Sequence, residues 1–214
     1  MEIFNLDFLA RWGHVLFGIT WIGILYYFNF IQGGYFKQAT PEALTDAKAK
    51  LAPSALWWFR WGAMFTFLTG LILLHGVATR ASSFIVLGAT LGTLMFLNVW
   101  FVIWPNQKIA LGLVSSGDAA KAGAKALLAS RTNTLFSAPM LFGMLASMHG
   151  TGQGFVPVTA ASFNATGLSV ALALVLALEA NALVGKQGPM TSVRGVIISS
   201  LVLTVVLVLL IQLL

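Results

Sequence analysis

Six apolar segments dominate the sequence, and their length constrains the fold more than any other feature. The segments run roughly over residues 8–31, 57–78, 83–104, 132–149, 162–184 and 192–213. Each is close to the roughly 20 residues that a helix needs to cross the hydrocarbon core of a bilayer. Backbone groups in lipid must be hydrogen-bonded internally, and the segments show no barrel-like alternation. The sequence therefore predicts an all-α, polytopic membrane helix bundle of about six transmembrane helices, forming a single domain over residues 1–214.

Composition excludes several other classes of protein. Apolar residues make up 58% of the chain and charged residues only 8%, which leaves too little polar surface for a soluble globular domain or a disordered chain. The net charge of +6 would suggest a nucleic-acid-binding domain in a soluble protein, but in a membrane protein a basic excess records topology. The chain has no cysteine. This excludes disulfides, thiolate metal sites, iron–sulfur clusters and haem bound covalently through Cys-x-x-Cys-His.

The basic residues predict the orientation. They gather in or beside alternate connections: Lys37, Lys48, Lys50 and Arg60, then Lys108, Lys121, Lys125 and Arg131, then Lys186 and Arg194. By the positive-inside rule these connections face the cytoplasm, so both termini are expected to be periplasmic in a bacterial inner membrane. Short amphipathic helices are expected in two of these connections. One begins at Pro41 and is limited by Pro53, and the other begins after Asp118 and runs to Ser130.

Three histidines are candidate ligands because of the depth at which this topology places them. His14 lies early in the first span, His75 near the end of the second, and His149 at the end of the fourth, so all three fall in the outer leaflet. Imidazoles from facing helices ligate haem iron and also copper or zinc. Gly18 and Trp21 share a helical face with His14. Gly18 leaves space beside the imidazole, and the Trp21 ring provides a flat aromatic surface next to that space. The pattern favours haem b held by two histidines, with copper held by all three as the rival. Purely structural histidines remain the alternative.

A second polar set falls in the cytoplasmic half of the predicted spans. It comprises Asn29, Arg60, Asn98, Glu179 and Asn181. Glu179 is the only acidic residue inside a span, and an isolated carboxylate is not tolerated in lipid. Arg60 is its expected partner. The set is interpreted as a structural interhelical pair, with a proton-transfer or substrate site as the alternative.

Three sequence runs resemble a known family. Residues 12–23 (WGHVLFGITWIG), 58–70 (WFRWGAMFTFLTG) and 98–107 (NVWFVIWPNQ) are similar to the membrane domain of the urate hydroxylase PuuD family, also called the urate oxidase N-terminal domain. The resemblance is stronger in the first half of the chain than in the second. It implies a haem-ligand role for His14, which lies inside the first run. Longer family members carry a C-terminal cytochrome c domain and are implicated in oxidising urate to 5-hydroxyisourate.

Three functions of different classes follow from these observations. The first is a membrane-bound b-type haem oxidoreductase that passes electrons to a separate periplasmic cytochrome c, since the chain has no Cys-x-x-Cys-His motif. The second is a non-catalytic accessory subunit of a respiratory or other membrane complex. The third is a copper-handling or transport protein. The lipid bilayer is the expected environment, nucleic acid is not an expected partner, and a homo-oligomer is left open.

Overall fold

The computed structural model describes residues 5–77, 81–115, 117–149 and 163–214, and these residues contain helices and no strands. Five helical stretches among them are long and apolar enough to cross a membrane: Leu6–Gln38, Pro41–Gly76, Ser83–Ala110, Ala165–Val184 and Val193–Leu213. They correspond to the first, second, third, fifth and sixth predicted spans. The all-α, membrane-type helical fold is therefore confirmed.

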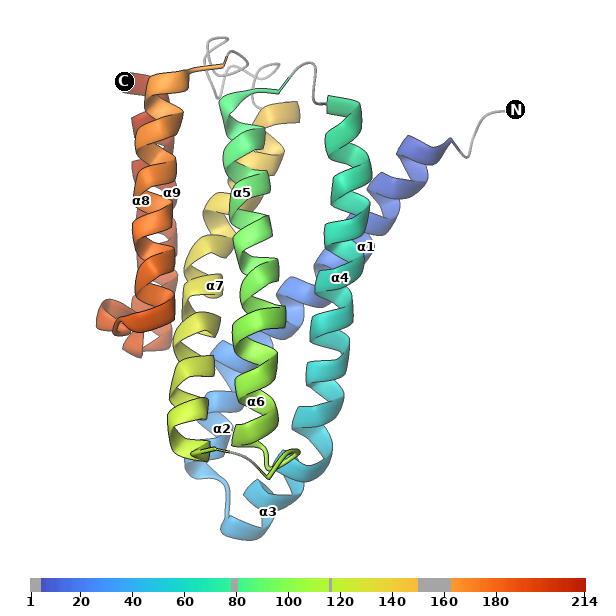
Figure 1. Ribbon diagram of the computed structural model, residues 1–214, viewed down its shortest axis with the longest axis vertical. Coiled ribbons are helices and arrows are strands. Elements are labelled where there is room, and N and C mark those ends of the chain that lie inside the picture. Colours follow the sequence, from blue (N-terminus) through green and yellow to red (C-terminus); the bar gives the residue numbers. More distant parts are fainter. Residues whose placement is uncertain (1–4, 78–80, 116, 150–162) are drawn as a thin grey trace. The chain divides into compact units, whose positions relative to one another are not determined.

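Several of these stretches are built from consecutive helical elements. The elements are α1 (Leu6–Tyr26), a π-helical turn η1 (Tyr27–Gln32), α2 (Gly33–Gln38), α3 (Pro41–Asp46), a π-helical turn η2 (Ala47–Leu51), α4 (Ala52–Val77), α5 (Ser83–Leu97), a π-helical turn η4 (Asn98–Ile103), α6 (Trp104–Ala110), α7 (Ala119–His149), α8 (Ala165–Val184), a 3₁₀ turn η6 (Gly188–Thr191) and α9 (Val193–Leu213). Figure 1 follows them along the chain.

The two predicted short helices begin where expected but do not end there. Thr40 caps α3, its hydroxyl accepting a hydrogen bond from the Ala43 backbone N–H. The helix then continues through Pro53 into α4, so the prediction that Pro53 limits it is wrong. Pro53 has no backbone N–H to donate, and it lies in the first turn of α4, directly after the π-helical turn η2, where the regular hydrogen-bond pattern of the α-helix is already interrupted.

Helix α7 corrects a second boundary. The Asp118 carboxylate accepts hydrogen bonds from the backbone N–H groups of Ala120 and Lys121, which confirms the expected cap. The helix does not end at Ser130 but runs for 31 residues to His149, so it also contains the predicted fourth span. It is not among the five stretches that meet the membrane-spanning criteria of length and composition.

Residues Met1–Leu74 and Phe96–Arg131 form one compact unit. Within it α1 and α4 approach closely at glycines. A Cβ added at Gly62 would lie 3.1 Å from the Trp21 backbone nitrogen, and one at Gly70 would lie 3.1 Å from His14 Cε1. Such close approach through small residues is the usual way in which membrane helices associate. Aromatic pairs extend the packing from α4 to the next helix, with Phe67 stacked on Phe96 at a centroid distance of 4.2 Å.

Residues His75–Met95 and Thr132–Leu214 form the second compact unit. Here α5 and α7 meet at two glycines. A Cβ at Gly88 would lie 3.1 Å from the Met144 backbone nitrogen, and one at Gly143 would lie 2.7 Å from the Phe84 carbonyl oxygen. Only glycine fits such a contact, which is typical of closely packed membrane helices.

Helices α8 and α9 lie side by side in this second unit (Figure 1). Asn164 joins their ends. Its side-chain oxygen accepts from the Gly167 N–H at 3.1 Å, which caps α8, and its amide donates to the Ile211 carbonyl at 2.8 Å. Gly167 permits the contact, because a Cβ there would lie 2.5 Å from the Leu210 carbonyl oxygen.

A proline inside α7 is compensated by α9. Pro139 has no N–H, so the Leu135 carbonyl four residues earlier loses its usual helical donor. The Ser200 hydroxyl of α9 donates to this carbonyl at 2.8 Å, and Ser200 is only 4% exposed. The helix therefore continues through Pro139 with its freed carbonyl hydrogen-bonded.

Candidate functional site

His14 is fixed between α1 and α4 by one of its ring nitrogens. Its Nδ1 lies 2.9 Å from the Thr66 carbonyl oxygen and 3.3 Å from the Thr69 hydroxyl. A carbonyl can only accept, so Nδ1 carries the hydrogen in this geometry. The Thr69 hydroxyl donates to the Phe65 carbonyl at 2.7 Å, which leaves its oxygen free to accept from His14 as well.

This arrangement leaves Nε2 of the neutral imidazole with an available lone pair. No described residue forms a hydrogen bond to Nε2. Histidines that bind metals commonly donate their other ring N–H to a backbone carbonyl, which fixes the tautomer and the ring orientation. His14 thus has the local geometry of a nitrogen ligand, and its half-buried position leaves the ring partly accessible.

The other residues predicted to accompany His14 on α1 lie along the same contact with α4. Trp21 is 2% exposed, and its indole N–H has no hydrogen-bond partner among the described residues. Gly18 faces the Thr66 methyl group, which would lie 3.9 Å from an added Cβ. Gly18 therefore has room for a small group beside it, and the predicted ligand gap remains a prediction.

His75 and His149 are both solvent- or lipid-exposed, and both lie in the last turn of a helix, α4 and α7 respectively. Across the parts of the chain that the structure describes, no three His, Cys, Asp or Glu side chains are grouped closely enough to hold a metal ion. The choice of second haem ligand and the rival copper site thus stay predictions.

The inner-side polar residues have local partners. The Arg60 guanidinium lies over the Trp104 ring, 3.9 Å from its centroid, a favourable cation–π contact. The Asn181 side chain donates to the Lys186 carbonyl at 2.9 Å and accepts from the Lys186 N–H at 3.2 Å, which closes the end of α8. Asn98 is 1% exposed, and Glu179 is half-buried on α8. The predicted pairing of Glu179 with this set stays a prediction.

A buried polar run on α7 was not singled out from the sequence. Ser130, Arg131, Thr132, Asn133, Thr134 and Ser137 are all at most 8% exposed. Sequence reasoning assigned Arg131 to a cytoplasmic connection, where a charge needs no partner. The useful indication is that no proline separates the Asp118 cap from Arg131, so a helix that starts at Asp118 can continue past the arginine.

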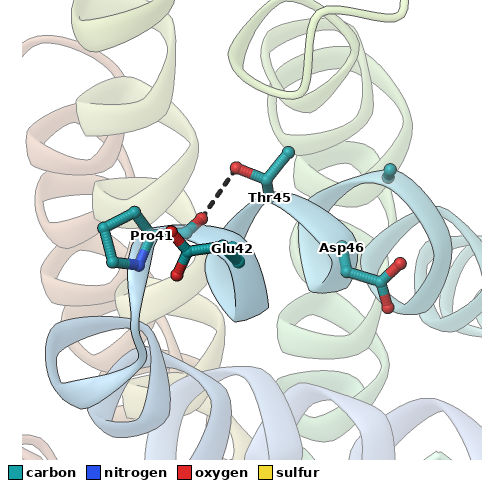
Figure 2. Close-up of a pocket in the computed structure, with 5 residues that line it drawn as sticks. Pro41, Glu42, Thr45 and Asp46 are labelled. Atoms are coloured by element: carbon teal, nitrogen blue, oxygen red, sulfur yellow. Dashed lines mark hydrogen bonds between the residues drawn. The ribbon is translucent and has the colours of Figure 1, made fainter.

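A shallow hollow on the surface of α3 is a separate feature. Figure 2 shows it lined by Pro41, Glu42, Thr45 and Asp46, with the Thr45 hydroxyl donating to the Pro41 carbonyl at 2.8 Å. Asp46 also pairs with Lys50 on the next turn. No histidine lines this hollow, so we assign it no role in the candidate site.

The described helices define a membrane-type all-α protein. Residues 75–178, just under half of the chain, match the model of the family described as urate oxidase N-terminal, so this region is similar to a urate oxidase N-terminal domain. The match lies further along the chain than expected. It contains the run 98–107 but excludes the runs 12–23 and 58–70, on which most of the resemblance rested. No curated protein and no solved structure gives a significant match.

Proposed function

We propose that the chain is a membrane-bound, b-type haem redox protein in which His14 would hold the haem iron through Nε2. The observation that carries the proposal is the hydrogen bond from His14 Nδ1 to the Thr66 carbonyl at 2.9 Å. This contact fixes the tautomer with a free Nε2 lone pair and holds the ring against α4. Haem, when bound, supplies reversible one-electron chemistry.

The rest of the donor set fits haem b better than other haem types. The chain has no cysteine, so neither thiolate ligation nor covalent attachment is available to it. His75 or His149 is the proposed second ligand, because the sequence predicts that both lie in the same leaflet as His14. Copper held by the three histidines is the competing assignment.

The family match supports an oxidoreductase role related to urate oxidation, because residues 75–178 match the urate oxidase N-terminal family. Electrons released in such a reaction need an acceptor, and we propose a separate periplasmic cytochrome c. The positive-inside rule, applied to the basic connections described above, predicts that both termini and the His14 end of α1 are periplasmic, and such an acceptor would dock on that side.

The test is a reduced-minus-oxidised spectrum, with metal analysis, of detergent-purified wild type and of His14→Ala, His75→Ala and His149→Ala. We expect a haem signal in wild type, its loss in His14→Ala and in one other variant, and its retention in the third. Thr69→Val is a matched second variant, since it keeps the size of the side chain while removing the weaker hydrogen bond to Nδ1, and should shift the signal without abolishing it.

Ligation requires neutral imidazole, so the haem signal should weaken as the pH falls below about 6. Copper in place of haem, lost in all three histidine variants, would support the competing assignment. Folded wild type with neither haem nor metal, purified tightly with a larger complex, would instead support the accessory-subunit function.

A further inference from the structure

Arg131 is a buried charged side chain without a partner. It is 8% exposed, and its Nε and Nη1 atoms are buried with no hydrogen bond to any described residue. The two ion pairs seen in the described part of the chain are Arg11–Asp7 and Lys50–Asp46, so neither involves it. A buried cation without a counter-charge is strongly unfavourable, and such groups inside membrane proteins mark functional sites.

The residue before Arg131 contacts a helical turn that carries two unpaired hydrogen-bond acceptors. The Asn29 amide donates to the hydroxyl of Ser130, the residue before Arg131, at 2.8 Å. Asn29 is 2% exposed, and its Oδ1 atom is buried without a partner. Gln32 follows one helical turn later, and its Oε1 atom is also buried without a hydrogen-bond partner. Both residues belong to the π-helical turn η1, a type of irregularity that is frequent at functional sites.

The unpaired atoms on the two sides are complementary to one kind of ligand. The unpaired Nε and Nη1 atoms of Arg131 offer charged N–H donors on two edges of the planar guanidinium, and an oxyanion is the acceptor that suits such donors. Asn29 and Gln32 offer two acceptors. We propose that these three residues form a binding site for a small organic anion that has a charged oxygen and a neighbouring N–H or O–H group.

This site is separate from the one at His14. Fifteen residues separate His14 from Asn29 along one continuous helix, which corresponds to about 22 Å at 1.5 Å per residue. That distance is about three-quarters of the hydrocarbon thickness of a bilayer. The anion is therefore a separate molecule and not a side group of a cofactor held by His14, and the inference does not depend on haem binding.

The oxyanion can come from a free organic anion or from an anionic lipid headgroup, and the experiment distinguishes them. Full-length protein is placed in nanodiscs of phosphatidylcholine alone, and its thermal unfolding is followed as orotate or benzoate is added. Orotate has a carboxylate beside a ring N–H, whereas benzoate has only the carboxylate. We expect both anions to raise the unfolding temperature, and orotate to bind more tightly.

Arg131→Gln should weaken binding of both anions by at least about tenfold, because it removes a charged hydrogen-bonding group. Lys125→Gln is the matched control, since it removes an exposed charge from the same helix, and should bind as wild type does. Asn29→Asp provides a variant that does not depend on removing the arginine. A carboxylate beside Arg131 should stabilise the ligand-free protein and abolish the response to both anions.

Stabilisation by phosphatidylglycerol in place of these anions, lost in Arg131→Gln, would assign the site to a lipid headgroup. The proposal is overturned if neither source gives an Arg131-dependent shift, or if Asn29→Asp responds to the anions as wild type does.

Discussion

Removing the Ser200 hydroxyl should destabilise the protein, because the Leu135 carbonyl of α7, which Pro139 deprives of its helical donor, would then have no hydrogen-bond partner. Pro139 withdraws the helical donor from the Leu135 carbonyl, and Ser200 donates to that carbonyl at 2.8 Å from a position only 4% exposed. Ser200→Ala leaves the carbonyl buried with no replacement from water. An unsatisfied buried group of this kind costs about 1–3 kcal/mol, while hydrogen bonds between membrane helices average about 0.6 kcal/mol and reach about 1.7 kcal/mol. We therefore expect the free energy of unfolding to fall by about 1–2 kcal/mol, near the overlap of these two ranges.

A double-mutant cycle with Pro139→Ala tests the reason for this cost. The Pro139→Ala substitution restores the N–H that the Leu135 carbonyl lacks, so Ser200→Ala should cost clearly less in that background. The free energy of unfolding is measured by denaturant titration in a fixed detergent for wild type, both single variants and the double variant. Ser199→Ala is the control, because no hydrogen bond from its hydroxyl is seen and its side chain is less buried. An equal cost of Ser200→Ala in the wild-type and Pro139→Ala backgrounds would refute the compensation.

Three further predictions concern helix packing and topology. Gly143→Ala should lower the free energy of unfolding by about 1–3 kcal/mol through overpacking, since its Cβ would lie 2.7 Å from the Phe84 carbonyl; Gly92→Ala should be neutral or stabilising, because only flexible methionine side chains lie near, at 3.9 Å. Both are measured in the same titration, and equal effects would argue against the close α5–α7 contact. Asn164→Ala removes the cap of α8 and its bond to α9 and should cost about 0.5–2 kcal/mol, seen as a lower unfolding midpoint. A C-terminal tag should be cleaved by protease added to spheroplasts, whose inner membrane is intact, and cleavage only after lysis of the spheroplasts would reverse the topology.

Local rules read from the sequence succeed where one residue decides the outcome. Thr40 and Asp118 begin helices because a side-chain oxygen satisfies free backbone N–H groups, whatever the tertiary context. The long apolar segments become helices because lipid leaves the backbone no other partner. The ends of helices depend on more distant contacts. The apolar segment 132–149 predicts a helix through Pro139, but the donor that compensates for the proline comes from α9 and cannot be read from the segment itself.

The candidate site was likewise predictable only where residues close in the sequence decide the outcome. His14 is recognisable from its depth and its neighbours on one helix, but its partners Thr66 and Thr69 lie more than fifty residues further on. The burial of Arg131 was not predicted, because its place in the sequence already had a simple explanation. The positive-inside rule accounts for a basic residue beside a connection, so its burial becomes visible only when the pairing of Ser130 with Asn29 is known.

The distribution of unpaired polar atoms indicates where ligand chemistry belongs in this chain. In the unit formed by Met1–Leu74 and Phe96–Arg131, buried atoms without a partner among the described residues occur at Trp21, Asn29, Gln32, Trp100 and Arg131; in the other unit only Gln212 has one. The second unit instead pairs its buried polar groups across helices, at Asn164 and Ser200 for example. Polar groups that are fully paired specify a fold, whereas unpaired ones keep their cost until a ligand binds. The first unit also contains His14 with its free Nε2, so we expect the proposed anion site and one of the two haem ligands in this unit.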